Sequence, residues 1–203
     1  MTKRRTWTAV IVTMVSVSVS AAPTFLDVWK SPEVSRLDFK GQTVAALVIT
    51  DNQSLQMSGE EALARELTAR GGTGLPTYRF VPREELKSAE KAKGWFERRG
   101  VKGVVALRPV SRDVENTPKV VFTSGYYQSF WGYYGYGWSN TYVTVASRKT
   151  TTIGVETLVY DITRDQLVWA AISETRNPDS LQEFVKDLVD AVAREMKKMK
   201  MVG

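Results

Sequence analysis

The side chains with the most binding potential in this sequence are aromatic, and almost half of them fall in one short stretch. The segment 122–142 holds 10 of the 21 Trp, Tyr and Phe residues, and four glycines are interleaved with them. Tyr and Trp combine a large apolar ring with a polar tip, which suits contact with a ligand or partner. The candidate binding residues are Tyr126, Tyr127, Phe130, Trp131, Tyr133, Tyr134, Tyr136 and Trp138.

The spacing of these rings matches neither a helix nor a strand, and glycine makes a backbone costly to order. We therefore expect an irregular or mobile loop at 123–141, and we expect deletion of 126–138 to leave the fold intact. Three roles are open. The rings could cap the core, they could form a surface for lipid headgroups or sugar rings, or they could anchor a partner or a second copy.

Two residue types that carry much enzyme chemistry are missing, because the chain has no cysteine and no histidine. Disulfides, thiolate catalysis, sulfur-bound zinc and cysteine lipidation are excluded. The commonest general base and imidazole metal ligand are also absent. These absences argue against an enzyme.

The carboxylates do not form a catalytic or metal-binding pattern. Those at strand ends and in turns are Asp51, Asp161 and Asp165, and those in first helical turns are Glu60, Glu61, Glu84 and Glu85. Aspartate is common in turns, and negative charge suits a helix N-terminus. No glycine-rich phosphate loop follows a strand. We predict no catalytic residues, no metal and no cofactor.

The first 21 residues have the pattern of a secretory signal. Lys3, Arg4 and Arg5 precede an apolar stretch at 7–19, and small residues follow at 18–22. An uncleaved anchor is the alternative, but the stretch is shorter than the roughly 20 residues that a spanning helix needs. We expect a periplasmic or otherwise exported protein that is not itself a lipoprotein.

The mature chain, 22–203, reads as a single α/β domain. The chain's net charge of +6 includes the three basic residues of the signal, which leaves +3 without a basic stripe, so we expect no nucleic-acid partner. Apolar runs predict strands at 25–30, 44–49, 77–81 and 101–110. Helices are expected at 58–70, where Ser58 and Glu61 form a capping box, and at 82–99.

The second part of the chain has a different pattern. Strands are predicted at 142–145, 153–162 and 167–173, the last two paired as a hairpin. A capping box of Ser180 and Glu183 then begins a helix with an apolar stripe. Core packing explains this stripe, and partner binding is the alternative.

The order of these elements resembles a family of uncharacterised bacterial envelope proteins, many of them described as lipoproteins. The resemblance lies in Trp29-Lys30-Ser31-Pro32, the strand 44–49 with its helix, the aromatic segment 126–138 and the hairpin 156–175. The layout is also similar to the TolB amino-terminal and curli-secretion lipoprotein type. This likeness implies an assembly or accessory module without catalytic residues. The lack of cysteine departs from the lipoprotein pattern.

Together these observations predict an α/β (α+β) fold: a strand-helix-strand-helix-strand unit, then a β-hairpin and a C-terminal amphipathic helix, with helices packed on a mixed sheet. The predicted function is that of an exported, non-enzymatic accessory or assembly protein. It would present its aromatic loop to an envelope protein, a glycan or a membrane surface. The alternative is a soluble periplasmic binding protein for a glycan or small apolar ligand.

Overall fold

The structure, a computed structural model, describes residues 22–110, 121–141 and 152–201. The predicted export signal and the predicted strand 142–145 lie outside these residues. The strands are β1 (Thr24–Lys30), β2 (Thr43–Val48), β3 (Thr73–Pro76), β4 (Gly103–Val110), β5 (Thr152–Asp161) and β6 (Gln166–Arg176). The helices are α1 (Gln53–Ala69), the 3₁₀ turn η1 (Thr77–Arg79), α2 (Ala89–Arg98), α3 (Gly125–Gln128), α4 (Phe130–Ser139) and α5 (Leu181–Lys198).

The six strands form one mixed sheet in the order β1-β6-β5-β4-β2-β3. β2 runs parallel to β3 and β4, and β5 is antiparallel to β4. β6 is antiparallel to β5, and β1 pairs antiparallel with β6 at the far edge. This is the predicted α/β fold, with the hairpin and the C-terminal helix in their expected places.

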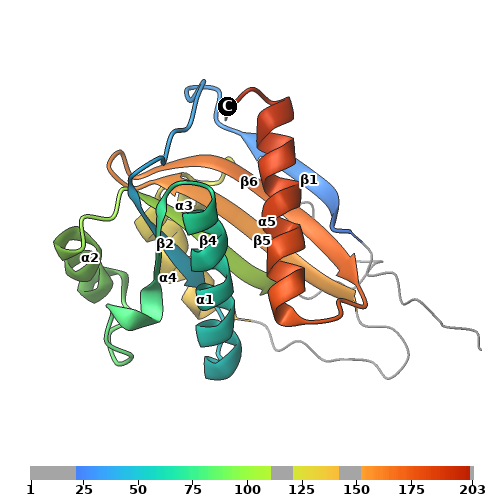
Figure 1. The fold of residues 1–203 in the computed structure, drawn as a ribbon. Helices are drawn as coiled ribbons and strands as arrows, with labels where there is room; N and C mark the ends of the chain where they lie inside the picture. The colour runs from blue at the N-terminus through green and yellow to red at the C-terminus, as the bar shows by residue number, and fades with distance from the viewer. Residues whose placement is uncertain (1–21, 111–120, 142–151, 202–203) are drawn as a thin grey trace, which may run out of the picture.

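Helices cover both faces of the sheet. In Figure 1, α1 and α5 stand side by side in front of the sheet, and α3 and α4 lie behind it. Alternate residues of β4 point to opposite faces: Val104 and Ala106 belong to one core, and Val105 and Leu107 to the other. We call the side covered by α2, α3 and α4 the aromatic face and the side covered by α1 and α5 the groove face.

The first long helix begins earlier than the capping box predicted. The Asn52 side chain accepts a hydrogen bond from the Leu55 N–H at 3.0 Å, so α1 starts at Gln53 and Ser58 lies inside it. Glu61 is occupied elsewhere, because its carboxylate accepts from the Tyr78 hydroxyl. In α5 the predicted cap is confirmed, since Ser180 Oγ accepts from the Glu183 N–H at 3.1 Å.

The region 73–99 differs from the predicted strand 77–81 and helix 82–99. β3 lies at Thr73–Pro76, where Gly74 passes so close under α1 that a Cβ would stand 2.0 Å from the Ala64 carbonyl oxygen. The chain then turns, and the Thr77 hydroxyl donates to the Ala46 carbonyl at 2.8 Å. Successive turns fill the start of the expected helix, and α2 begins only after Ser88. Local turn contacts therefore override the apolar pattern here.

Within the three described ranges, none of the helices combines the length and the apolar character that a membrane crossing needs.

Candidate functional site

The aromatic segment is helical and largely buried, so the expectation of an irregular or mobile loop at 123–141 is wrong. It forms α3 and α4 on the aromatic face. Five of the eight candidate residues are buried: Tyr127, Phe130, Tyr133, Tyr134 and Trp138. The role as a core cap, which the sequence left open, is the one that the burial supports.

Contacts from distant residues explain why this glycine-rich stretch forms a helix. Ser129 caps α4, and the Asp165 carboxylate in the hairpin turn accepts from the N–H groups of Phe130 and Trp131, at 2.8 and 3.3 Å. A carboxylate at a helix N-terminus satisfies amides that lack partners. Gly137 brings α4 close to β2, because a Cβ there would stand 2.7 Å from Ile49 Cδ1.

A buried charged pair holds this segment to the sheet. Arg108 on β4 and Glu156 on β5 are register partners, and Arg108 Nε lies 2.8 Å from Glu156 Oε2. The hydroxyls of Tyr127 and Tyr133 both donate to the same carboxylate. Arg108 also donates to the Asn140 carbonyl at the end of α4, at 2.9 Å. Strands β4 and β5 and both aromatic helices therefore meet at one carboxylate.

This network can pack and orient but has no reactive group to offer. Burial, together with the Glu156 charge, raises the pKa of Tyr127 and of Tyr133 well above the usual value, so both phenols stay protonated as donors. Glu156 is fully buried and Arg108 almost so. The carboxylate is neutralised by its partners and out of reach of a substrate.

Only a small part of the predicted aromatic surface faces solvent. Tyr126 is 40% exposed, and Trp131 and Tyr136 are half-buried. The Tyr126 ring stacks on Tyr136 with 4.2 Å between ring centroids. The segment therefore offers three rings, not eight, to any partner.

The groove face contains an apolar cavity that sequence reasoning did not identify. It has a volume of about 730 Å³, within the range of roughly 300–1,000 Å³ typical of ligand sites. Its floor is formed by β2, β4 and β5, and its walls by α1 and α5. The floor residues are Val44, Val105, Leu107, Thr157 and Val159, and the apolar wall residues are Leu67, Leu188, Val189, Val192, Ala193 and Met196. We call this cavity the α1–α5 groove.

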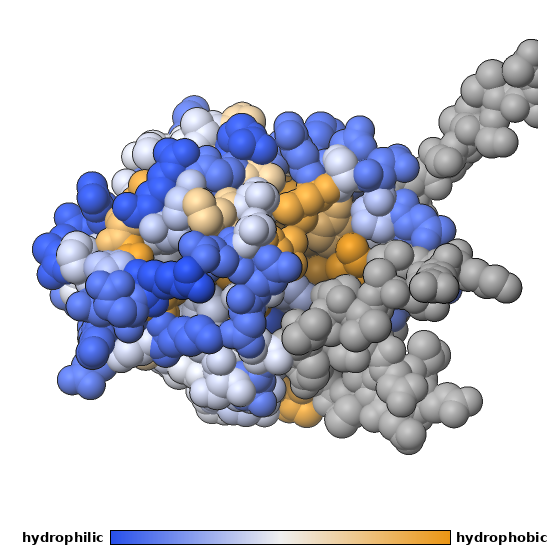
Figure 2. All heavy atoms as spheres, turned by 90° about the horizontal axis from the view of Figure 1, so that it is seen from below, coloured by the Kyte–Doolittle hydropathy of each residue, from blue (hydrophilic) through white to orange (hydrophobic). Residues whose placement is uncertain are grey.

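Apolar residues also reach the surface on the underside of the molecule. The view from below shows them in a hollow with hydrophilic residues at its border (Figure 2).

One polar side chain lies in the floor of the α1–α5 groove. Thr157 is 1% exposed, and its Oγ1 has no hydrogen-bond partner among the described residues. An unpaired buried hydroxyl costs about 1–3 kcal/mol, so a water or a polar ligand atom would be stabilised beside it. A ligand pocket is typically apolar with a few such polar groups.

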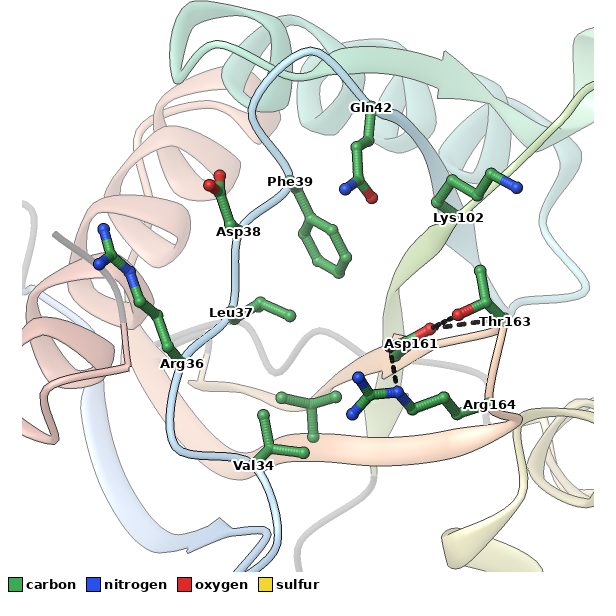
Figure 3. Close-up of a pocket in the computed structure, with 11 residues that line it drawn as sticks. Val34, Arg36, Leu37, Asp38, Phe39, Gln42, Lys102, Asp161, Thr163 and Arg164 are labelled. Carbon is green, nitrogen blue, oxygen red and sulfur yellow. Dashed lines mark hydrogen bonds and ion pairs between the residues drawn. The ribbon is translucent and has the colours of Figure 1, made fainter.

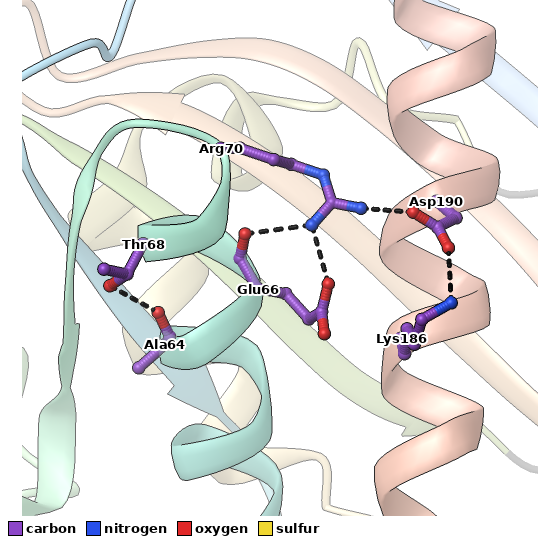
Figure 4. Close-up of polar contacts among 6 residues, drawn as sticks. All are labelled: Ala64, Glu66, Thr68, Arg70, Lys186 and Asp190. Atoms are coloured by element: carbon purple, nitrogen blue, oxygen red, sulfur yellow. Dashed lines mark hydrogen bonds and ion pairs between the residues drawn. The ribbon is translucent and has the colours of Figure 1, made fainter.

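Among the described residues, one ion pair joins the two wall helices, and a neighbour on each helix supports it. Arg70 on α1 bridges Glu66 on its own helix, at 2.7 Å, and Asp190 on α5 (Figure 4). Lys186 adds a 3.1 Å contact to Asp190. These residues are partly exposed, so the pairs position the helices more than they stabilise the fold.

A chain segment at 34–42, which we call the strap, separates the groove from a second cavity of about 450 Å³. Arg36 to Phe39 line both cavities. In Figure 3, Leu37 and Phe39 point into the second cavity, whereas Arg36 and Asp38 point away from it. The Phe39 ring needs a glycine beneath it, because a Cβ on Gly103 would lie 2.4 Å from the ring. The strap is therefore seated on the sheet by its aromatic residue.

A second buried carboxylate supports the groove face away from the cavity. Glu60 on α1 is fully buried and accepts from the backbone N–H groups of Val48 at 3.1 Å and Tyr78 at 2.7 Å. Burial raises its pKa to about 7. It joins α1 to the ends of β2 and η1.

The remaining predicted carboxylates make structural contacts. Asp161 accepts from the Thr163 N–H at 3.0 Å in the hairpin turn, and Asp51 pairs with Lys87. Among the described residues, no three carboxylates gather as they would around a metal ion.

The groove was missed because its floor residues belong to strands that are far apart in the sequence. The one signal available was the broad apolar stripe of α5, interrupted on its groove side by Arg194 and Lys197. Core packing explains most of that stripe, as predicted, and the part of it that lines the groove is also buried except for the half-buried Ala193.

Comparisons with known proteins do not identify a family for this chain. No family model matches the chain, and no curated protein matches it. The PelC dodecamer from Paraburkholderia phytofirmans superposes with a TM-score of 0.46 at 13% identity, covering 88% of this chain and 98% of PelC. A single-residue variant of that dodecamer superposes with a TM-score of 0.42 at 12% identity, and the match covers 79% of this chain and 96% of the variant chain. At these TM-scores we draw no functional conclusion from either structure.

Proposed function

We propose that this protein is an exported, non-enzymatic accessory protein of the cell envelope that binds a small apolar ligand in the α1–α5 groove. The observation that carries the proposal is the groove itself: a cavity of about 730 Å³ with an apolar floor on the central strands, between two helices that the Arg70–Asp190 ion pair joins. The apolar lining of a cavity of this size would gain packing contacts from an apolar ligand.

The other potential site supports the proposal less well. Five of the eight candidate binding residues of the aromatic segment are buried in the core. We therefore assign the binding function to the groove face and not to the aromatic face. The ligand class follows one of the two alternatives of the sequence analysis, a binding protein for a small apolar molecule.

The compartment rests on the sequence. The basic, apolar and small-residue parts of 1–21 support export. A groove for apolar molecules suits an envelope, where lipids are abundant.

The exposed rings of Tyr126, Trp131 and Tyr136 support a second, smaller role in contact with an envelope partner. Aromatic rings of this type anchor protein interfaces. Replacing Tyr126 by Ser should then reduce co-sedimentation of the protein with envelope fractions. Unchanged co-sedimentation would remove this second role and leave the groove untouched.

The ligand-binding proposal is tested with a neutral apolar probe. The purified protein is titrated with 1-N-phenylnaphthylamine, whose fluorescence rises in an apolar site. Ala193→Trp places a bulky ring in the groove from the half-buried side of α5. Probe affinity should fall by about 10-fold or more, equivalent to about 1.4 kcal/mol.

The matched control is Gln182→Trp, the same residue introduced at an exposed position of the same helix outside the groove. Circular dichroism and thermal unfolding of both variants verify that they fold. Equal probe binding by wild type and Ala193→Trp, or no binding by the wild type, would contradict the proposal.

A further inference from the structure

We infer that the ligand of the α1–α5 groove is a single-chain lipid with an anionic headgroup, its chain on the apolar floor and its headgroup at the strap end of the groove. This inference rests on the proposed function and adds the charge and shape of the ligand. It comes from the distribution of charge around the groove.

The lining of the groove is apolar in the middle and basic at the rim. Five cations and two anions line it, which leaves a net charge of +3 on the lining. The cations are Arg36, Lys40, Arg70, Arg194 and Lys197, and the anions are Asp38 and Asp190. The net positive charge of the lining would not attract a neutral apolar ligand, whereas it would attract an anionic headgroup.

Most of these cations are not already paired with the rim anions. Arg70 is engaged by Glu66 and Asp190. The other four are exposed and form no ion pair with any described residue within 4.0 Å. Their charge is therefore available to a ligand.

The unpaired cations gather at one end of the groove. Arg36 and Lys40 lie on the strap, and Arg194 and Lys197 are three residues apart near the end of α5. The strap is fastened to this end of α5, because the Leu37 N–H donates to the Met201 carbonyl at 2.7 Å. A headgroup placed there would meet basic side chains from two separate chain segments.

The apolar part continues inward from that end. Val192 and Met196 on α5 face the floor residues Val105 and Val159 across the cavity. The groove is basic at one end and aliphatic along its length. It therefore matches a molecule with an anionic headgroup and an aliphatic chain. A single chain suits a cavity of about 730 Å³ between two helices.

The test compares three amphiphiles that share a linear ten-carbon chain and differ in the charge of the headgroup: decanoate, decan-1-ol and decyltrimethylammonium. Each displaces bound 1-N-phenylnaphthylamine from the purified protein at pH 8, where decanoate is ionised. Decanoate should displace the probe at about 5-fold lower concentration than decanol, from two or more exposed charge contacts. Salt should reduce this advantage, because it screens exposed charges.

A charge-matched pair of variants locates the headgroup. Arg194→Gln/Lys197→Gln removes two rim cations, and Lys91→Gln/Lys93→Gln removes two exposed cations from α2 on the other side of the sheet. The first double variant should lose the advantage of decanoate over decanol, and the second should keep it. Persistence of the advantage in the first variant would overturn the headgroup position.

The remaining outcomes separate this inference from the proposed function. Equal displacement by decanoate and decanol, or a preference for the cation, would overturn the anionic ligand while the apolar groove stands. Failure of the probe and of all three molecules to bind would overturn both. If the protein sediments as a dimer that Ala193→Trp dissociates, the groove is an interface between copies, and both are also overturned.

Discussion

The two faces of the sheet are built from the same strands but are packed differently. Among the described residues, nine of the buried core residues on the aromatic face are aromatic, whereas on the groove face the buried aromatic residues are Trp169 and Phe184. The four buried tyrosine hydroxyls of the aromatic face all donate to a described partner. On the groove face the Thr157 hydroxyl has none, and a cavity remains above it.

The difference between the two faces shows that residue types that favour binding can instead be used in core packing. Large rings interlock, and the hydroxyls of Tyr127 and Tyr133 meet at the Glu156 carboxylate, so they close the aromatic face. Smaller aliphatic side chains under α1 and α5 leave a cavity of about 730 Å³ on the groove face, although the residues of its floor are almost fully buried. We expect ligand binding on the groove face, where packing contacts between side chains are missing.

Deletion of 126–138 should abolish cooperative unfolding. This reverses the expectation from sequence, because the deletion removes Phe130, Tyr133 and Tyr134 from the core and leaves Glu156 without its phenol donors. Each buried aromatic lost costs about 3–5 kcal/mol, and together they exceed the stability of an ordinary domain. Thermal unfolding followed by circular dichroism checks this. A sharp transition in the deletion protein would show that the aromatic face is dispensable.

Glu156→Gln should lower the free energy of unfolding by about 3–5 kcal/mol, because it leaves the buried Arg108 charge uncompensated. Urea unfolding measures it. The control is Glu195→Gln, which breaks the exposed pair with Lys198 and should cost about 0.5 kcal/mol. Similar small losses in both variants would mean that the buried network does not hold the aromatic face together.

Glu60 should make stability depend on pH near neutrality. Burial raises its pKa to about 7 in the folded protein from 4.5 in the unfolded chain. The folded state therefore binds more protons between these values, and the free energy of unfolding should fall by about 3 kcal/mol as pH rises from about 4.5 to above 7. The chain has no histidine to obscure this.

Urea unfolding at pH 5 and at pH 8 measures the difference, and Glu60→Gln should remove it. Because Gln cannot accept from all the donors around Glu60, its stability at pH 5 will be lower than that of the wild type. The informative quantity is the change between the two pH values. An equal fall in wild type and variant would assign the slope to other groups.

The smallest effect on the free energy of unfolding should come from replacing either of two buried threonines by cysteine. Thr157 and Thr175 are both buried in the sheet with unpartnered hydroxyls, but only Thr157 lines the groove. Because the chain has no cysteine, Thr157→Cys and Thr175→Cys each introduce a single thiol. Both should change stability by about 1 kcal/mol or less.

Their thiols should react very differently with an apolar maleimide. Both side chains are almost fully buried, but Thr157 lines the groove and Thr175 does not, so Thr157→Cys should react on the order of 10-fold faster with a reagent that enters the groove. Decanoate should protect it. Mass spectrometry of the labelled protein gives the rates. Equal rates at both positions would show that the groove floor is not accessible.

The fold was predictable because its signals are local. The continuous apolar run at 44–49 predicted β2, and the stripe that begins at Ser180 predicted α5, both confirmed with small shifts in their ends. The helical state of 130–139 was not predictable from its glycines, because Asp165 and Glu156, both far along the chain, stabilise it. Tertiary contacts overrode propensity.

The candidate site was harder to predict for the same reason. Composition pointed to the aromatic rings, but burial is a property of the whole fold. The groove joins Val44, Leu107 and Thr157 with residues of α5, and no short motif connects them. An open groove is a gap in packing, which leaves no mark in the residue types on either side of it.

The most direct test of the contrast between the two faces is a methyl NMR titration of the protein with decanoate. The account predicts chemical-shift changes at the groove-face methyls of Val105, Val159 and Leu188, with those of Leu86 and Leu158 on the aromatic face unchanged. Shifts confined to the aromatic face, or none on either face at saturating decanoate, would contradict it.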